Sequence, residues 1–517
     1  MGFSGRSALV AIALMSAGCD AKVILPSGDA GSVDAGRQDA GPSDAGPFDA
    51  GSVDAGSVDA GSVDAGPLDA GVVTATATFS PVALDPDAGD LTNPMRGQYL
   101  WLGTSAYPAG WTDLDAYERW EWVTVEPSEG NINWQLIDDQ LDAARARGGR
   151  FGMRVMPLCE GCASHTYQGA QSSIPDDLAA VANPLIAAAP GDDPSVLYVL
   201  PDWNSDAYLN RLQELLQAIG THYANDPTFA WMDVSSYGNW GEFHLYPFTT
   251  AGGPYDTSTQ RPITDANAIR IVDMNAAAFP NKLLVVNSEQ AAALGEAVAT
   301  TSPPVGLRVD CVGSDGLAGG QSAISAVPGA DQLWRRAPFI TEWCQYNLGN
   351  SGADLFVQGE QQVRDFHISM MSSGNFQSPP STADEIAAFR AANLEAGYRL
   401  RPTSVQLTID RTSQRVRVVS HWVDDGVAPT YLAWQPVLVL DGPAHVELPL
   451  AMDLRQVMPD APLDDDESLD ASTLLTSGSY TASLRVDDVQ AISQPMNLGI
   501  AGRVSDGSYA LGSVQLP

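Results

Sequence analysis

Strand-like and helix-like segments alternate along residues 93–400, and this alternation constrains the fold more than any other feature of the 517-residue chain. Amphipathic segments such as residues 134–147, where Leu136, Ile137, Leu141 and Ala144 share one helical face, separate the strand candidates. Strands that alternate with helices form a parallel α/β sheet. Eight such units predict a (β/α)8 TIM barrel, which we place at residues 76–401. The strand candidates are residues 98–102, 121–125, 151–157, 229–235, 283–288, 306–312, 339–343 and 371–376.

Beyond Arg401 the pattern changes to short strand-like runs separated by turn residues, with no segment of helical length between them. This pattern predicts a β-sandwich over residues 402–517. The runs are Val405–Ile409, Val416–Trp422, Val437–Leu440, His445–Leu448, Ser483–Val486 and Val514–Leu516.

The first 19 residues have the form of an export signal. Arg6 is their only charged residue and precedes an apolar stretch that is too short to span a bilayer permanently. The small residues 16–18 directly before Cys19 resemble a bacterial lipobox, although Ser16 stands where that motif usually has leucine. The resemblance implies a lipid-modified Cys19 and a protein anchored to the bacterial cell envelope, in the periplasm or on the cell surface. The alternative is an ordinary secretory signal with an incidental cysteine.

Residues 20–75 are dominated by Asp-Ala-Gly, which recurs with a period of five from Asp29 to Asp69. Such sequence has few apolar residues to bury and repels itself, which predicts a disordered linker. A calcium-binding repeat is the alternative, but one carboxylate in five residues is sparser than the ligands of known calcium loops.

The formal net charge is −37, and the repeat aspartates account for only a quarter of it. An acidic chain is a poor partner for nucleic acid or for anionic polymers. Twelve tryptophans favour neutral sugars as ligands instead. We expect a carbohydrate substrate, no cofactor, no metal and contact with a membrane only through the anchor; the oligomeric state stays open.

Four cysteines remain besides Cys19, and an exported protein can oxidise them. Cys311 and Cys344 lie at the ends of neighbouring predicted strands, so a disulfide between them is sterically reasonable. Cys159 and Cys162 can close a small loop or stay reduced. A four-cysteine zinc site is the alternative; we favour two disulfides.

Two glutamates close predicted strands. Glu242 follows the fourth strand candidate and Glu342 lies in the seventh, a spacing that fits three βα units of about 31 residues. Both are therefore predicted at the rim where such barrels carry their active sites. Two carboxyl groups that face each other across a cleft are the working parts of a glycoside hydrolase. Glu126 and Glu289 also close strand candidates and are the rival carboxylates.

The expected chemistry needs one protonated and one ionised carboxyl group. Tyr237, Trp240 and Phe243 surround Glu242 in the sequence, and this apolar setting predicts a raised pKa for a general acid. Arg154 is expected to keep Glu342 ionised as the nucleophile, or else only to balance Glu126 or Glu160.

Further residues are predicted to bind the substrate. Tryptophan side chains can stack on sugar rings, and polar side chains can bond to hydroxyl groups. The candidates are Trp101, Trp240 and Trp343 for stacking, and Tyr237, Asn239, His244, Asp310 and Asn375 for further contacts. Each tryptophan has packing in the barrel as its alternative role. Two long connections, at residues 159–203 and 243–264, are expected to shape the cleft.

The barrel resembles clan A of the glycoside hydrolases, in which an acid/base Glu follows the fourth strand and a nucleophile Glu follows the seventh. The resemblance implies these roles for Glu242 and Glu342, and a retaining mechanism. One departure stands out: the clan has Asn directly before the acid/base Glu, whereas this chain has Gly241, with Asn239 two residues earlier. Gly-Glu after a fourth strand also resembles the inverting β-amylases, so the stereochemical outcome stays open.

A second resemblance covers most of the chain beyond the linker. The motifs Asn-Pro-Met-Arg-Gly at 93–97, Arg-Trp-Glu-Trp at 119–122, Met-Arg-Val-Met-Pro at 153–157 and Asp-Asp-Gly-Val-Ala-Pro-Thr-Tyr at 424–431 look like the bacterial family catalogued as domain of unknown function 4832 with its barrel-type N-terminal partner. The resemblance implies a glycosidase-like barrel and no particular substrate.

Three other interpretations remain. A barrel that binds a glycan at the cell surface without cleaving it is favoured by Gly241. A lyase or transglycosylase would use the same cleft, and a structural spacer would not need the two glutamates. The sequence has no Gly-x-Ser-x-Gly, His-Glu-x-x-His or phosphate-binding Gly-Lys-Ser/Thr motif to support other enzyme classes.

Overall fold

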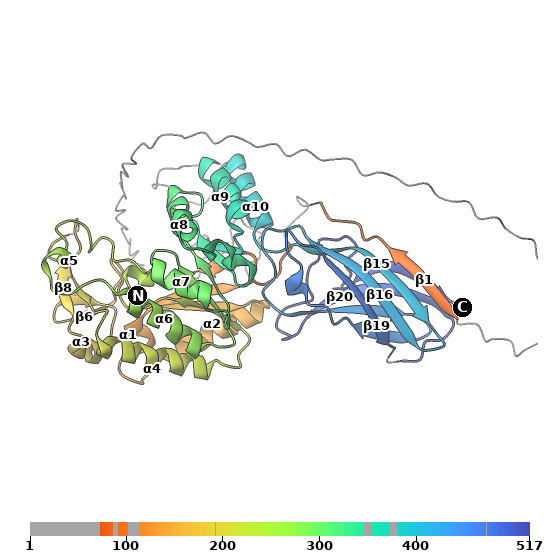
Figure 1. The fold of residues 1–517 in the computed structure, drawn as a ribbon, viewed down its shortest axis with the longest axis horizontal. Coiled ribbons are helices and arrows are strands. Elements are labelled where there is room, and N and C mark those ends of the chain that lie inside the picture. Colours follow the sequence, from red (N-terminus) through yellow and green to blue (C-terminus); the bar gives the residue numbers. More distant parts are fainter. Residues whose placement is uncertain are drawn as a thin grey trace, which may run out of the picture. The chain divides into compact units, whose positions relative to one another are not determined.

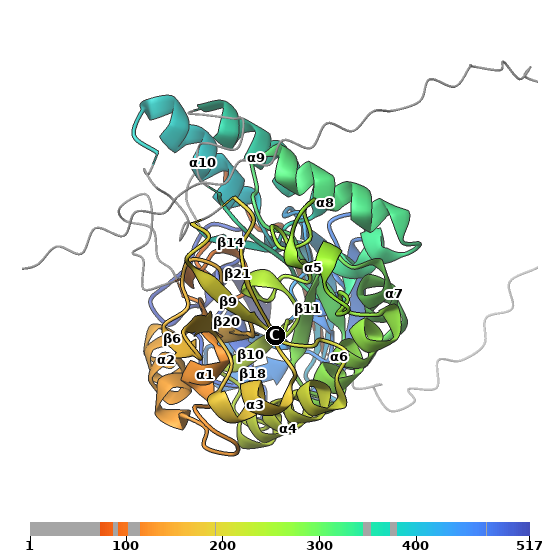
Figure 2. The same cartoon turned by 90° about the vertical axis from the view of Figure 1, so that its left-hand side faces the viewer.

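The computed structural model describes residues 73–517 apart from 86–90, 102–113, 192, 345–352, 373–379 and 472. Within these residues a nine-stranded parallel sheet with surrounding helices fits the predicted TIM-type fold (Figures 1 and 2). In sheet order the strands are β2 (Gly97–Gln98), β14 (Met370–Ser372), β13 (Phe339–Glu342), β12 (Val305–Arg308), β11 (Leu283–Asn287), β10 (Phe229–Val234), β5 (Phe151–Met156), β4 (Ala116–Glu121) and β3 (Leu100–Trp101).

The two end strands of this sheet are consecutive in the chain and are separated only at Tyr99. β2 pairs in parallel with β14, and β3 pairs in parallel with β4. The sheet therefore closes through residues 97–101, as a barrel requires.

Helices surround the strands (Figure 2). The longer ones are α2 (Trp134–Arg147), α4 (Asp206–His222), α6 (Asp265–Ala278), α7 (Ala291–Ala299), α8 (Asp315–Ala326), α9 (Ala353–Phe366) and α10 (Ala383–Glu395). Local signals set their ends. The side chain of Ser205 caps α4 by accepting from the N–H of Tyr208, and Gly148 ends α2 in the left-handed conformation. No helix among the described residues is long and apolar enough to cross a bilayer.

The second barrel strand differs from its prediction. The strand is β4, and residues 122–125 of the expected strand form the short helix α1 (Trp122–Val125). Trp122 and Val125, three residues apart, are both buried, which suits a helical turn. The expected strand begins too late because Arg119 looks like a surface residue, whereas the barrel interior at this height is polar.

Two layers of side chains form the barrel core. Phe151, Met153 and Val155 of β5 belong to the large apolar cluster that includes the helices. Tyr117 and Trp231 belong to a separate cluster formed by strand residues. Successive residues of a strand point to opposite faces, so the intervening positions on each strand face the barrel interior.

The long connection after β5 forms a small sheet of its own. Its strands are β6 (His165–Tyr167), β7 (Ala170–Ser172), β9 (Leu197–Leu200) and β8 (Leu185–Ala188), with α3 (Asp176–Val181) between β7 and β8. The connection after β10 carries the short helices η2 (Asn239–Gly241) and α5 (Pro254–Thr257). In Figure 1, β6, β8 and α5 lie at the same end of the barrel.

The C-terminal part contains two four-stranded antiparallel sheets. One has the order β1 (Thr74–Phe79), β15 (Leu400–Asp410), β16 (Arg415–Asp424), β19 (Leu463–Asp470); the other has β18 (His445–Pro449), β17 (Trp434–Asp441), β20 (Gly478–Asp488), β21 (Tyr509–Leu516). The short helices η3 (Ala330–Arg335) and η4 (Leu454–Gln456) lie in connections. Buried residues of both sheets, such as Leu407 and Leu438, share one apolar cluster, which is compatible with the predicted sandwich.

One segment belongs to a different sheet than its sequence range suggested. β1 pairs antiparallel with β15, from Thr74 opposite Asp410 to Phe79 opposite Val405 (Figure 1). Residues 76–79, which the predicted range 76–401 assigned to the barrel, are therefore an edge strand of the C-terminal sheets. Phe79, the last residue of this six-residue strand, is buried among residues of the two C-terminal sheets, and this burial favours the pairing.

Candidate functional site

Glu242 and Glu342 lie on either side of one arginine. Glu342 is the last residue of β13, and Glu242 follows η2, the short helix after β10. Arg119 of β4 donates from Nη1 to Oε1 of Glu242 at 2.8 Å, and its Nη2 lies 3.4 Å from Oε1 of Glu342. The fold thus brings both predicted glutamates together at the carboxyl ends of the strands.

Two more arginines extend these contacts into a closed ring of charges. Arg154 donates from Nη1 to Glu242 at 2.9 Å and from Nε to Oδ2 of Asp233 at 2.8 Å. Arg308 donates from Nη2 to Oε2 of Glu342 at 2.8 Å, and its Nε lies 3.5 Å from Oδ2 of Asp233. The ring alternates cation and anion in the order Arg119, Glu342, Arg308, Asp233, Arg154, Glu242.

One side of the ring is fully buried and the other is partly exposed. Asp233, Arg154 and Arg308 are fully buried, and Tyr117 also donates to Asp233 at 2.7 Å. Buried charges are tolerated only when they are paired and hydrogen-bonded, and the ring pairs each of them. The side chains of Arg119 and Glu242 keep 12% and 13% exposure, so this side of the ring is not fully enclosed.

The surroundings of Glu242 favour its ionised form, contrary to the expectation from its sequence neighbours. Burial raises the pKa of its carboxyl group, but the hydrogen bond from His244 and the guanidinium groups of Arg154 and Arg119 outweigh burial and hold the pKa well below its usual range. Nε2 of His244 lies 3.4 Å from Oε2 of Glu242. The aromatic rings expected to keep Glu242 neutral pack on each other instead, with the centroids of Tyr237 and Phe243 at 5.9 Å.

Asp310, two residues beyond the end of β12, behaves in the opposite way. Burial raises its pKa well above the usual range, and the carboxylates of Glu342 and Glu242 add to this, while Arg308 and Arg154 oppose it without cancelling it. Oδ1 of Asp310 lies 3.0 Å from Nη2 of Arg308. The site therefore holds carboxyl groups with widely separated pKa values, which is how acid and base roles are distinguished in active sites.

Arg154 does not pair with Glu342, nor with Glu126 or Glu160. Its partners are Asp233 and Glu242, because the guanidinium reaches across the neighbouring strand β10. The cations beside Glu342 are Arg308 and Arg119.

The predicted stacking role fails for two of the three tryptophans. Trp343 is fully buried and packs on Phe356 and Phe389, with centroids 5.2 and 5.5 Å away. Glu342 faces the barrel interior, so the next residue has to point to the helices. Trp101 is 2% exposed, and the guanidinium of Arg119 lies 4.0 Å over its ring.

Trp240 remains the candidate for stacking on a sugar. It is partly exposed, donates from Nε1 to the carbonyl of Glu160 at 3.2 Å and meets the ring of His244 edge-on at 5.8 Å. His244 is likewise partly exposed and lies beside Glu242.

Two other predicted contacts are structural. Asn239 is buried and uses its amide to hold the loop after β5: it accepts from the N–H of Glu160 at 2.9 Å and donates to that residue's carboxylate and to the carbonyl of Tyr246. It therefore does not replace the asparagine of the clan A pattern. Tyr237 is buried against Trp203 at a centroid distance of 5.1 Å. Asn375 and Cys19 lie outside the described residues.

The glycine before Glu242 has a local reason. Gly241 has a φ of 73°, in the left-handed region, and a Cβ there would lie 3.2 Å from Cδ of Arg154 and from Cβ of Ser235. Asparagine at this position would be crowded against the arginine that binds Glu242. The departure from the clan pattern therefore accompanies the charge ring.

The rival glutamates do not form a site. Glu126 is buried and accepts from Nε1 of Trp122 and from the N–H of Gly130, both at 2.9 Å, and it pairs with Arg211. It therefore stabilises the turn after α1. Glu289 is exposed beyond the end of β11.

Both predicted disulfides are present. Cys159 is bonded to Cys162 and Cys311 to Cys344, which excludes the four-cysteine zinc site. Among the described residues, no group of three or more His, Cys, Asp or Glu side chains is placed to hold a metal ion.

Sequence reasoning missed Arg119, Asp233 and Arg308. Asp233 and Arg308 lie inside apolar strand candidates, and a charge in a strand that is buried on both faces is a signal of a functional or structural ion pair. Arg119 was missed because its strand was misplaced.

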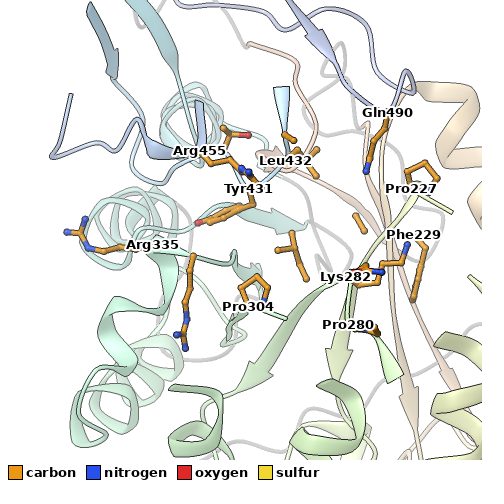
Figure 3. A pocket seen from close by; sticks show the side chains of 16 residues that line it. Pro227, Phe229, Pro280, Lys282, Pro304, Arg335, Tyr431, Leu432, Arg455 and Gln490 are labelled. Carbon is orange, nitrogen blue, oxygen red and sulfur yellow. The ribbon is translucent and has the colours of Figure 1, made fainter. Parts of the chain in front are cut away.

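A cavity of about 410 Å³ lies at the other ends of the strands (Figure 3). Phe229 and Leu283, the first residues of β10 and β11, line it together with Tyr431 and Lys282. In Figure 3 the guanidinium of Arg335 points away from Pro304 and Tyr431. The cavity contains none of the predicted site residues and is separate from the charge ring.

Neither a protein-family model nor a curated protein matches the sequence, so the resemblance to domain of unknown function 4832 stays a prediction. Solved structures similar to this chain include endo-glycoceramidase II from Rhodococcus sp., with a TM-score of 0.36 and 11% identity over 69% of this chain and 89% of that one. A GH5-4 broad specificity endoglucanase from an uncultured bacterium has a TM-score of 0.36 and 10% identity over 61% and 96%. The exo-beta-1,4-mannosidase Op5Man5 from Opitutaceae bacterium strain TAV5 has a TM-score of 0.29 and 11% identity over 54% and 49%. At these TM-scores the likeness carries no argument about the function of this chain.

Proposed function

We propose that this protein hydrolyses O-glycosidic bonds of an extracellular poly- or oligosaccharide. The observation that carries the proposal is the placement of Glu242 and Glu342 at the carboxyl ends of β10 and β13, both within 3.5 Å of the guanidinium of Arg119. Active sites of parallel barrels lie at this end of the strands. Paired carboxyl groups at this position are the chemical requirement for cleaving a glycosidic bond.

Glu342 is the nucleophile in this proposal, acting by a retaining mechanism. It is fixed at a strand end by Arg308, so it does not need to reorganise when a sugar arrives. Its attack on the anomeric carbon gives a covalent glycosyl-enzyme, which water then hydrolyses.

In this proposal Glu242 binds and positions the guanidinium groups of Arg119 and Arg154 beside the substrate. As an anion bound by Arg119 and Arg154, it is not a proton donor in the structure as it stands. A sugar ring that comes between Glu242 and Glu342 has to move the Arg119 guanidinium, which now bridges them. The freed carboxylate of Glu242 can then accept hydrogen bonds from sugar hydroxyl groups.

The test is hydrolysis of a panel of polysaccharides and aryl glycosides by the purified protein and by single variants. Glu342→Gln is expected to lose about 10⁴-fold or more in kcat/KM, because the nucleophile is gone. Glu289→Gln is the matched control, since Glu289 is an exposed glutamate beyond a neighbouring barrel strand. Equal loss in both variants, or no loss in either, would contradict the proposal.

A second candidate is a surface protein that binds a glycan without cleaving it. The closed ring favours it, because every charge in the ring is already paired and Arg119 occupies the space between the two glutamates. Calorimetric titration with oligosaccharides distinguishes the two. Binding without any released product, unchanged in Glu342→Gln, supports the binding protein.

The proposed location is the cell envelope, through a lipid on Cys19. Support comes from the small residues that precede this cysteine and the apolar stretch before them. Metabolic labelling with a radioactive fatty acid should mark the wild-type protein and not Cys19→Ala. Label in both proteins would rule out this anchor.

A further inference from the structure

We propose that Asp310 is the proton donor of this site and works opposite Glu342. This inference rests on the proposed function and adds a catalytic residue to it. It moves the acid role away from Glu242, the residue after the fourth strand that the clan A resemblance implied.

The first support is the distance between the two carboxyl groups. Oδ1 of Asp310 and Oε2 of Glu342 both approach the same atom, Nη2 of Arg308, at 3.0 and 2.8 Å. The two oxygens therefore cannot lie farther apart than these two distances taken together. This limit is compatible with the separation of about 5–5.5 Å between the carboxyl groups of retaining glycosidases.

The second support is the backbone that carries them. Directly after Asp310, the N–H groups of Cys311 and Val312 both donate to the carbonyl of Glu342 at 3.0 Å. Cys311 has a φ of 72° and is bonded to Cys344. A side chain other than glycine seldom adopts this conformation, and functional sites are where such exceptions gather. The turn thus ties Asp310 to the strand end that holds Glu342.

The third support is the charge count. The ring contains three guanidinium groups and three carboxylates, so it is neutral without Asp310. A fourth carboxylate would be an uncompensated charge at a buried position. Within the described part of the chain, neither oxygen of Asp310 receives a hydrogen bond, although Arg308 is within ion-pair distance. These surroundings favour the neutral acid, in agreement with its raised pKa.

The proton of the Asp310 carboxyl group goes to the glycosidic oxygen while the bond between that oxygen and the anomeric carbon breaks. A carboxylate oxygen of Glu342 forms the new bond to the same carbon. In the second half, Asp310 takes a proton from water, the water oxygen bonds to the anomeric carbon, and Glu342 is released.

The leaving group provides the test. Methyl glycosides need a proton on the departing oxygen, whereas dinitrophenyl glycosides depart without one. Asp310→Asn is expected to lose about 10²–10⁴-fold in kcat/KM with methyl glycosides and to stay within about tenfold of wild type with dinitrophenyl glycosides. Added azide should restore turnover of the dinitrophenyl substrate and give a glycosyl azide. Glu242→Gln is the matched control and should lose equally with both substrates.

The outcomes separate the two proposals. Dependence on the leaving group in Glu242→Gln, with none in Asp310→Asn, would show that Glu242 is the donor and overturn the inference. Full activity of Glu342→Gln, or no hydrolysis of any glycoside by the wild type, would instead overturn the proposed function.

A measurement without substrate examines the proton itself. At neutral pH an ordinary carboxyl group is ionised. The infrared difference spectrum between the wild type and Asp310→Asn at this pH should show a protonated carboxyl band that only the wild type has, because the pKa of Asp310 is raised. The same band in both proteins would show that Asp310 is not the group that carries the proton.

Discussion

The guanidinium of Arg119 lies 4.0 Å over the ring of Trp101 and bridges Glu242 and Glu342. The indole ring thus supports a cation that contacts both glutamates. A cation over an aromatic face contributes about 0.5–2 kcal/mol, more when water is excluded, and Trp101 is 2% exposed.

We predict a measurable coupling between these two residues. In a double-mutant cycle with Trp101→Leu and Arg119→Met, the coupling free energy of unfolding should be at least about 0.5 kcal/mol. Urea denaturation of the four proteins measures it. Additive effects of the two substitutions would mean that the stacking contributes nothing.

Asp233 should be essential for stability, because Arg154 and Arg308 both depend on it at full burial. Asp233→Asn is expected to reduce the free energy of unfolding by about 3–5 kcal/mol, since it leaves three guanidinium groups in the ring with only two carboxylates to balance them. The exposed pair of Arg417 and Asp466 supplies the control, and Asp466→Asn should have little effect. Comparable losses in the two variants would contradict the importance of the ring.

Stability should respond to pH in opposite directions at Glu242 and Asp310. The pKa of Glu242 is lowered in the folded state, so its contribution is present above the unfolded value of about 4.3 and is lost as the pH falls through the folded pKa. The pKa of Asp310 is raised, so folding becomes less favourable as the pH rises from about 4 toward its folded pKa.

The check is chemical denaturation across this range. Glu242→Gln should flatten the loss of stability on the acid side, and Asp310→Asn should flatten the decline toward alkaline pH. If the free energy of unfolding depends on pH in both variants as it does in the wild type, the opposite pKa shifts of Glu242 and Asp310 are refuted.

The two disulfides should differ in their importance. Cys311–Cys344 closes 33 residues and holds the turn after Asp310, whereas Cys159–Cys162 closes three. On loop entropy alone, replacing the first pair by serine should cost about 3–4 kcal/mol and replacing the second about 2 kcal/mol. Beyond stability, we expect the first replacement to lower kcat at a temperature where both variants are folded. Equal kcat values would show that the disulfide does not position Asp310.

The sequence predicted the barrel, the two glutamates and both disulfides, because strand ends in a parallel barrel share one rim whatever the details of the loops. The partners of Arg154 could not be predicted in this way, since they depend on which side chains of neighbouring strands reach one another. The pKa of Glu242 depends on a turn in which Gly238, Trp240 and Gly241 all have positive φ, and this turn aims the carboxylate at two arginines.

The error at Trp343 was avoidable. Once Glu342 is assigned to the barrel interior, strand alternation places its neighbour on the opposite side. The apolar neighbours of Glu242 in the sequence likewise do not predict its pKa, because Tyr237 and Phe243 pack on one another and not on its carboxyl group.

The pairing of β1 with β15 has a mechanical consequence for the proposed anchor at Cys19. Tension applied through the residues before Val73 would enter the described part of the chain at Thr74 and meet six residue pairs along β15 before reaching the first barrel strand. The edge strand would carry that load first and come loose before the barrel strands are strained. Under such a pull Glu242 and Glu342 would thus be shielded by a strand that takes no part in their chemistry.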